Sequence, residues 1–336
     1  MSHRLGVDVG GTFTDLVLVS PDGVARTRKV LSTTANYAEA IVIGVRELAI
    51  QAGIAARDIG EIIHGTTVAT NAILERRGAR TGLLTTEGFR DLLEIGRLRL
   101  SRLYDLDFER PAPLVPRRWR REIRERMNHR GEVVTPLDRE GAAAAIDRLL
   151  DEGVESIAVC FLHAYANPAH EAQVGAMIRE RAPGVALTLS SEILPEMREF
   201  ERTSTAVTNA YVMPVMGRYL ASLEDELRTL EATAPLLIMQ SNGGVMTAEG
   251  GRRRPVHVIE SGPAAGVIAT AALARRIGEG NVISIDMGGT SSIRRPTAAG
   301  SRASARSRSA GAMSSAMSSP APAAGATRSS AIPSVS

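Results

Sequence analysis

The chain has 336 residues, of which 44% are hydrophobic and 23% are charged, a composition typical of a soluble globular protein with about two domains. Six of its 40 Lys and Arg residues lie in the segment 291–336, which has no acidic residue, so the rest of the chain has 34 basic and 37 acidic residues. The basic excess is confined to that last segment, and we expect no nucleic-acid partner.

The sequence also carries signals about location. No run of about 20 apolar residues is present, so we expect no membrane span and no membrane partner. The N-terminus enters a strand-like pattern directly and lacks the apolar core of a signal peptide. Cys160 is the only cysteine, which excludes an internal disulfide and a cysteine-based metal site and favours a cytoplasmic protein.

In chain order, the first half alternates strand-like and helix-like stretches. Helix-capping residues and turn residues mark their ends, notably Pro21–Gly23 for a hairpin, Asn36 and Asp138 for helix starts, and Gly53, Gly78 and Gly153 for helix ends. We predict strands at 4–9, 16–20, 24–31, 61–65, 81–86, 156–162 and 185–190. We predict helices at 37–52, 67–77, 138–152 and 168–181, and a proline-containing loop at 104–120.

The second half continues the alternation. We predict helices at 199–212 and 215–231, a strand at 235–240 and a strand with a turn at 256–263. A further helix is predicted at 264–277 and a final strand at 281–289. This order of elements favours an α/β fold built from layers, with a domain boundary near 190–200.

A short motif occurs twice. The stretches "VDVGGTFTD" at 7–15 and "IDMGGTSS" at 285–292 share one pattern: a hydrophobic residue, then Asp, then a variable residue, then Gly-Gly-Thr. Each copy follows a predicted strand. Glycines let backbone N–H groups approach an anion, and Thr12 and Thr14 add hydroxyl donors. Asp8 and Asp15 suit a hydrated Mg²⁺. The alternative is a tight turn capped by Asp, but two copies favour binding of nucleotide phosphates.

Three other polar stretches leave a choice between a site and a local structural role. His64, Thr66, Thr67 and Asn71 lie where a strand ends and a helix starts, which fits an anion or polar ligand and fits simple N-capping equally well. "QSNGG" at 240–244, with Ser241 and Asn242, fits a ligand loop, although the residues alone favour a turn. "ESGPAAG" at 260–266 fits a site and tight helix packing alike.

Other candidate groups have structural explanations. Cys160 lies within an apolar strand and is predicted to be buried, and His163, His170 and His257 lack metal-ligand spacing. The stretch 196–205 has Glu and Arg at helical spacing, which predicts solvated ion pairs. No G-x-S-x-G or H-E-x-x-H motif supports a serine hydrolase or a zinc protease.

Six stretches together resemble the hydantoinase A / 5-oxoprolinase family. They are "GVDVGGTFTDLVLV", "HGTTVATNAILERRGARTGLLTTEGFRDLLEIGR", "SSEILPEMREFERTSTAVTNAYV", "MQSNGGV", "ESGPAAGV" and "IDMGGTS", in this order, and the resemblance covers about residues 4–291. It implies an actin-like ATPase fold, with two lobes built on RNase H-like sheets and ATP·Mg²⁺ between them. In the resemblance, the first phosphate loop corresponds to Asp8, Gly10, Gly11, Thr12 and Thr14, and the second to Asp286, Gly288, Gly289 and Thr290; Asp15 is a further candidate cofactor-binding residue. Asp8 and Asp286 then become the catalytic residues that hold Mg²⁺ through water.

The resemblance also implies an activity. Family members use ATP to open cyclic amides such as 5-oxoproline or N-methylhydantoin, and a related subunit activates a ketone for carboxylation. Phosphorylating the amide oxygen makes a good leaving group, a step that needs phosphate positioning and charge neutralisation rather than a protein nucleophile. We therefore expect an ATP-dependent cyclic amidase with a hydantoinase B-type partner subunit. The alternatives are a ketone carboxylase subunit and a non-catalytic actin-like module.

Residues after Ser291 depart from the family pattern, which continues there as Thr-Asp and a further strand. The segment 292–336 has no Leu, no aromatic residue and no acid, which predicts disorder. Lys29 is the only lysine, as expected for a GC-rich gene, and out-of-frame reading of such DNA yields this composition. We predict a lobe at 1–190, an incomplete second domain at 191–291 and a frame-shifted rather than native tail, and we expect the chain alone to lack lactam-opening activity.

Overall fold

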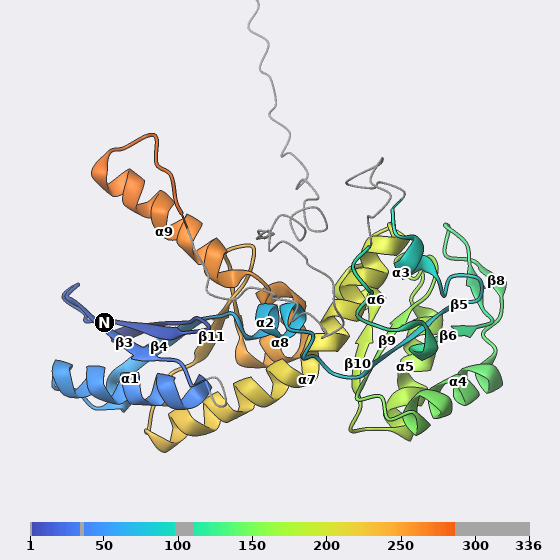
Figure 1. Ribbon diagram of the computed structural model, residues 1–336, viewed down its shortest axis with the longest axis horizontal. Helices are drawn as coiled ribbons and strands as arrows, with labels where there is room; N and C mark the ends of the chain where they lie inside the picture. Colours follow the sequence, from blue (N-terminus) through green and yellow to red (C-terminus); the bar gives the residue numbers. More distant parts are fainter. Residues whose placement is uncertain (1, 34–36, 98–109, 286–336) are drawn as a thin grey trace, which may run out of the picture. The chain divides into compact units, whose positions relative to one another are not determined.

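The structure is a computed structural model that describes residues 2–33, 37–97 and 110–285; the predictions for Asn36, Asp286, Gly288, Gly289 and Thr290 lie outside these ranges. Its larger sheet has six strands in the order β12-β11-β4-β1-β2-β3 (Figure 1). The strands are β1 (His3–Val9), β2 (Phe13–Val19), β3 (Ala25–Leu31), β4 (Ile59–Thr66), β11 (Leu236–Met239) and β12 (Val245–Thr247). The first three strands pair antiparallel, β4 is parallel to β1 and β11, and β12 is antiparallel to β11.

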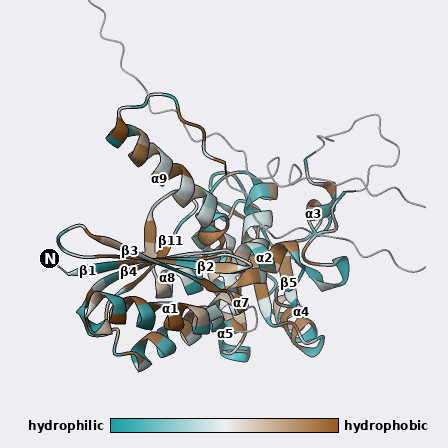
Figure 2. Cartoon of the chain, turned by 60° about the vertical axis from the view of Figure 1, so that its left-hand side comes forward, coloured by the Kyte–Doolittle hydropathy of each residue, from teal (hydrophilic) through white to brown (hydrophobic). Residues whose placement is uncertain are grey.

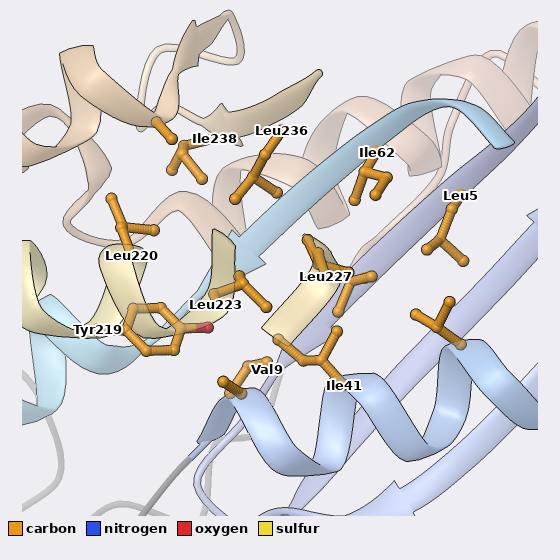
Figure 3. Packing of buried hydrophobic residues seen from close by; sticks show 14 of the residues in the cluster. Leu5, Val9, Ile41, Ile62, Tyr219, Leu220, Leu223, Leu227, Leu236 and Ile238 are labelled. Carbon is orange, nitrogen blue, oxygen red and sulfur yellow. The ribbon is translucent and has the colours of Figure 1, made fainter. Parts of the chain in front are cut away.

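The two faces of this sheet differ. One face carries Leu5, Val9 and Ile62 into a hydrophobic core with α1 (Tyr37–Ala52) and α7 (Glu199–Thr229) (Figure 3). Figure 2 shows that α1 carries both hydrophobic and hydrophilic residues, as an amphipathic helix with one buried side must. Because side chains alternate along a strand, Asp8 of β1 and its cross-strand partner Asp15 of β2 lie on the opposite face, which we call the open face.

The second sheet is parallel throughout, in the order β10-β9-β5-β6. Its strands are β5 (Thr81–Thr86), β6 (Arg120–Ile123), β9 (Ser156–Cys160) and β10 (Ala186–Leu189). One face packs against α4 (Arg139–Asp151) and α5 (Ala169–Arg181), and the other against α7. Asp138 caps α4 by accepting a hydrogen bond from the Gly141 amide at 2.9 Å, as predicted. A two-stranded sheet pairs β7 (Arg126–Met127) with β8 (Val133–Thr135).

Short elements complete the described part of the chain. Six of them were not predicted, because three to six residues give too little periodicity to recognise. They are η1 (Ala56–Asp58), α3 (Leu92–Ile95), η2 (Arg117–Trp119), α6 (Ser190–Ile193), α8 (Ala248–Arg253) and η3 (Pro255–Val258). The helices α2 (Val68–Leu74) and α9 (Ser261–Ile277) lie where helices were predicted at 67–77 and 264–277. No helix among the described residues is long and apolar enough to cross a membrane.

The prediction of two helices at 199–212 and 215–231 is wrong, because α7 runs through Pro214 without interruption. Proline inside a helix costs about 3 kcal/mol. Val212 and Met216 on either side of it are fully buried, and α7 contributes residues to the cores of both sheets. This burial offsets the lost hydrogen bond and keeps the helix continuous.

One more predicted strand is wrong, and another does not form over the part that the structure describes. Residues 256–263 form η3 and the start of α9, because the Val256 amide bonds to the Asn209 side chain of α7 instead of a neighbouring strand. Residues 281–285 form no strand, and Ile283 is 89% exposed. No strand in the described ranges pairs with this segment, and a strand needs a partner for its backbone hydrogen bonds.

Gly78, between α2 and β5, gives a test of the core packing. A Cβ at this position would lie 2.1 Å from the ring of Tyr211 on α7, so Gly78→Ala is expected to lower the free energy of unfolding by about 1–3 kcal/mol. Gly217 lies on α7, the helix that carries Tyr211, and an added Cβ there would have no atom within 4 Å. Gly217→Ala should therefore raise the free energy of unfolding by about 0.5–1 kcal/mol. Urea unfolding of both variants measures the difference, and equal effects would contradict the packing.

Candidate functional site

Hydrogen bonds within the protein stabilise the turn that joins β1 to β2. The Gly10 amide donates to the Phe13 carbonyl at 2.9 Å, and a Cβ on Gly10 would lie 3.1 Å from that oxygen. Ser32, after β3, donates its hydroxyl to the Gly10 carbonyl and its amide to the Thr12 carbonyl, both at 2.9 Å. The Gly10, Thr12 and Phe13 carbonyls therefore accept hydrogen bonds from other groups of the protein, while the Thr12 side chain is exposed.

Asp8 lies on the open face beside the first turn of α9. It is paired with Gly65 of β4, and a Cβ on Gly65 would lie 3.1 Å from Asp8 Oδ1. A Cβ on Gly262 of α9 would lie 3.9 Å from the same oxygen. The start of α9 has no side-chain cap, and the positive end of its dipole lies beside the Asp8 carboxylate. We call Asp8, Gly65, Ser261 and Gly262 the Asp8 cluster.

Two contacts fix the start of α9 at this place. The Ser261 hydroxyl donates to the Thr66 carbonyl of β4 at 3.4 Å, and the Glu260 amide donates to the Thr70 hydroxyl of α2 at 3.1 Å. Glu260 itself has a left-handed backbone with φ of 61°, which is unusual for a residue other than glycine. The stretch "ESGPAAG" therefore both packs against the sheet and brings its glycine to Asp8.

Asp15 and Thr14 point in different directions. Asp15, on the open face, forms a half-exposed ion pair with Lys29 of β3 at 2.6 Å. Thr14 is fully buried, and its hydroxyl lies 2.9 Å from the Ser32 hydroxyl. Thr14 thus supports the turn from the core side, whereas the Asp15 carboxylate has a cation beside it.

His64 and Thr66 lie in the core rather than at the surface, since both are 0% exposed. His64 Nε2 lies 2.6 Å from the Tyr219 hydroxyl of α7, and its Nδ1 has no hydrogen-bond partner in the described ranges. Burial lowers the pKa of His64 to about 4 and raises the pKa of Tyr219, which lies next to Thr66. The imidazole is therefore neutral near pH 7, and it supports β4 from beneath the Asp8 cluster.

Thr67 and Asn71 join the start of α2 to the end of β1. The Thr67 hydroxyl donates to the Val9 carbonyl at 3.0 Å and accepts from the Asn71 side-chain amide at 3.2 Å. Thr67 occupies the N-cap position of α2 without making a side-chain cap bond. These two residues connect α2 to β1 directly after Asp8.

Ser241 and Asn242 form the hairpin turn between β11 and β12, which confirms the turn favoured by the residues. The Asn242 side chain accepts from the Gly244 amide at 2.8 Å, and the Ser241 hydroxyl donates to the His257 carbonyl at 3.1 Å. Gly243 has φ of 87°, and a Cβ there would lie 2.4 Å from the end of Ile268 on α9. The turn therefore packs against α9, the helix that begins at the Asp8 cluster.

The low pKa of His64 predicts a loss of stability in mild acid. In the unfolded chain His64 takes up a proton near pH 6.5, whereas the folded protein resists protonation until about pH 4. Stability should therefore fall as the pH decreases from 6.5 to 4, by about 3 kcal/mol from this residue. Urea unfolding across this range should show a weaker pH dependence for His64→Gln, while the exposed control His129→Gln should behave like the wild type. An unchanged pH dependence in His64→Gln would contradict the buried neutral imidazole.

The fold and the site together define a class of protein. Three antiparallel strands continue into parallel strands, and a Gly-Gly turn follows the central strand β1. This is the α/β fold of actin-like, RNase H-like ATPases. Residues 4–182 match the family model described as the hydantoinase/oxoprolinase N-terminal region, and residues 202–309 match the hydantoinase/oxoprolinase model. The chain belongs to the hydantoinase/oxoprolinase family.

Known relatives include enzymes with different substrates. Caprolactamase subunit alpha of Pseudomonas jessenii is 40% identical over 86% of this chain, and 5-oxoprolinase 1 of Arabidopsis thaliana is 34% identical over 86%. The crystal structure of the ATP-dependent caprolactamase matches 85% of the chain with a TM-score of 0.77, and nucleotide-free acetone carboxylase matches 82% with a TM-score of 0.76 and 26% identity. The chain spans 42% of the length of the caprolactamase subunit and 25% of the oxoprolinase.

Proposed function

We propose that this chain binds the phosphates of ATP at the Asp8 cluster and the turn 10–12, as part of an ATP-dependent enzyme that opens a cyclic amide. The observation that carries the proposal is the position of Asp8, which lies between a Gly-Gly turn and the start of α9. A helix N-terminus and a glycine turn both present backbone N–H groups to an anion. Caprolactamase is ATP-dependent and acts on a cyclic amide, which supports the assignment.

The donor set at Asp8 fits a hydrated Mg²⁺. Mg²⁺ keeps several waters and binds proteins through one or two carboxylates together with substrate phosphates. No group of three His, Cys, Asp or Glu side chains that could hold a metal occurs in the described ranges. The exposed carboxylate of Asp8 suits Mg²⁺ held through water and is the proposed ligand, and the proposed Asp286 lies outside the described residues.

The roles of the remaining residues follow from their contacts. Gly11 and the exposed Thr12 lie in the turn and are proposed to contact phosphate, and Gly10, whose amide donates to the Phe13 carbonyl, is proposed to shape the turn around it. Thr14 and Asp15 keep the turn in place through Ser32 and Lys29. Gly288, Gly289 and Thr290 are the proposed second phosphate loop. Bound ATP would supply the phosphoryl group that converts the amide oxygen into a leaving group.

Substrate contacts are proposed for the polar residues around this region. Thr67 and Asn71 lie next to the end of β1, whereas Ser241 and Asn242 lie in the turn against α9. His64 and Thr66 are buried, so their proposed part is to keep β4 and its Gly65 beside Asp8. A hydantoinase B-type subunit is the proposed partner, and a cytoplasmic location stays a prediction.

A second candidate function is activation of a ketone for carboxylation. The match to acetone carboxylase favours it, because that protein shares the fold over 82% of this chain. A third candidate, a non-catalytic actin-like module, requires nucleotide binding without any organic substrate.

Coupling between ATP and the organic substrate distinguishes these functions. Binding of Mg·ATP to the full chain should become tighter in the presence of a cyclic amide such as 5-oxoproline, N-methylhydantoin or caprolactam. Two ligands that favour the same conformation each raise the affinity of the protein for the other. Calorimetric titrations with each amide, and with acetone plus bicarbonate, measure this effect. Tightening by the ketone alone would favour the carboxylase subunit, and no tightening by either would favour the non-catalytic module.

A further inference from the structure

The outer edge of β3 is free of a neighbouring strand. β3 is the last strand of the six-stranded sheet, and none of the described strands pairs with its far side. It has 7 residues and is therefore about 24 Å long. A free edge presents a row of unpaired backbone N–H and C=O groups, which can pair with a strand from another chain.

The hydrogen bonds between β2 and β3 show which backbone groups face this edge. The Ser32 amide donates to the Thr12 carbonyl at 2.9 Å, the Ser20 amide donates to the Val24 carbonyl at 3.0 Å, and the ladder between these two bonds has no register shift. Hydrogen-bonded and non-hydrogen-bonded pairs alternate in an antiparallel ladder, so the even-numbered residues of β3 bond to β2. The backbone groups that face the free edge belong to the odd-numbered residues, which are Ala25, Thr27, Lys29 and Leu31.

Helix α1 continues the surface beneath this edge. It packs against β2 and β3, and its Glu47 forms an ion pair with Arg28 of β3 at 2.5 Å. Ile43 and Ile50 lie on the same side of α1 as Glu47, four residues before it and three after it. These two isoleucines are 43% and 74% exposed. A stripe of exposed isoleucines beside a free strand edge indicates a protein contact.

We infer that a second copy of this chain occupies this edge. The two β3 strands pair antiparallel across a two-fold axis at Arg28, and the two α1 helices pack side by side. Ala25 then lies opposite Leu31 of the second copy, and Thr27 lies opposite its Lys29. All four outward residues take part, and about eight backbone hydrogen bonds form. Both copies use the same surface, as in most homodimers.

The charges of β3 select this register. The strand contains Arg26, Arg28 and Lys29 and no acidic residue, and like charges directly opposite each other destabilise a ladder. In the inferred register Arg28 alone faces its own counterpart, and each Arg28 has Glu47 beside it. A shift by one pair in either direction would place Arg26 opposite Arg28 or Lys29 opposite Lys29, and would also remove about two backbone hydrogen bonds.

The same axis brings the two α1 stripes together. Because Glu47 lies beside Arg28, the axis also passes near Glu47, and Ile43 of one copy lies toward Ile50 of the other. Contact between these side chains removes apolar surface from water, which adds to the strand pairing. The edge and the stripe thus complement themselves about a single axis. This self-complementarity favours a second copy over a strand of another protein.

Arg28→Cys tests the pairing at the axis. The only native cysteine, Cys160, is buried. Opposite residues in a non-hydrogen-bonded pair have Cα atoms about 4.5 Å apart, a distance that a disulfide can bridge. Mild oxidation of Arg28→Cys should therefore give a covalent dimer on a non-reducing gel. The matched control Arg26→Cys would lie about 14 Å from its counterpart in the second copy and should stay monomeric on the gel.

Sedimentation velocity of the full chain at micromolar concentration gives an independent readout, and the wild type should be a dimer. Thr27→Pro removes an N–H that faces the free edge without removing a bond to β2, so it should give a monomer, whereas Thr27→Val should stay dimeric. Ile50→Glu places a charge in the contact and should weaken dimerisation at least about tenfold. The matched control Ile277→Glu, 56% exposed at the end of α9, should dimerise like the wild type.

Three results would each overturn the inference. They are a wild-type chain that is monomeric throughout the micromolar range, equal crosslinking of Arg28→Cys and Arg26→Cys, and dissociation by Ile277→Glu but not by Ile50→Glu. Circular dichroism shows whether each variant is folded. Should Thr27→Pro fail to fold, Ile50→Glu and the two cysteine variants still decide, because they change only side chains at the surface. A monomeric wild type would leave the edge of β3 to a strand of another protein.

Discussion

Asp8→Asn is expected to weaken the binding of Mg·ATP at least about tenfold while leaving the fold intact. A neutral amide does not attract a hydrated Mg²⁺ as a carboxylate does. Asp8 is exposed on the open face, so its replacement disturbs no core packing. Without Mg²⁺ the sign should reverse: the variant should bind ATP at least as tightly as the wild type, because a negative charge beside the phosphates has been removed.

Asp15→Asn is the matched control for this experiment. Asp15 is the cross-strand partner of Asp8 on the same face, but its carboxylate is paired with Lys29. We expect a change of less than about threefold, as for other exposed ion pairs. Calorimetric titrations with and without Mg²⁺ measure both variants. Equal losses in Asp8→Asn and Asp15→Asn, or a loss in Asp8→Asn that does not depend on Mg²⁺, would contradict the role of Asp8.

Glu171→Ala is expected to lower the free energy of unfolding by about 3 kcal/mol or more. Glu171 is fully buried in α5 and accepts three hydrogen bonds, from the end of β9 and from the start of α6. Alanine would leave two backbone amides and one hydroxyl buried without acceptors, and each such group costs about 1–3 kcal/mol. Part of this loss is recovered where water enters.

Glu180→Ala, on the same helix but exposed, provides the control and should change stability by less than about 0.5 kcal/mol. Chemical unfolding followed by circular dichroism compares the two variants. A small effect of Glu171→Ala would mean that other contacts hold the end of β9 and the start of α6.

Local signals explain why much of the fold could be predicted. The hairpin at Pro21–Gly23, the strand 81–86 and the helix capped by Asp138 each depend on residues close in sequence, and the structure has all three. The Gly-Gly turn at the end of β1 could be placed for the same reason. Its glycine pattern and the preceding strand lie within one short stretch of the chain.

Contacts between distant residues explain what could not be predicted. Helical spacing in 196–205 predicted solvated ion pairs within that stretch. Arg202 is instead buried and donates to the Phe161 carbonyl, and Glu201 pairs with Arg97, which lies far away in the sequence. The burial of His64 depends on Tyr219, which lies far away in the sequence. The position of Gly262 beside Asp8 depends on how α9 meets β4, and sequence alone left its role open.

The most direct test of ATP binding at the Asp8 cluster is to map where a non-hydrolysable ATP analogue protects the chain. Amide hydrogen exchange, measured with Mg²⁺ and the analogue, should slow at the turn 10–12 and at the start of α9, residues 261–264. In Asp8→Asn the same protection should require much more analogue. Protection elsewhere with no change at these two segments would contradict the proposal that the Asp8 cluster holds the phosphates of ATP.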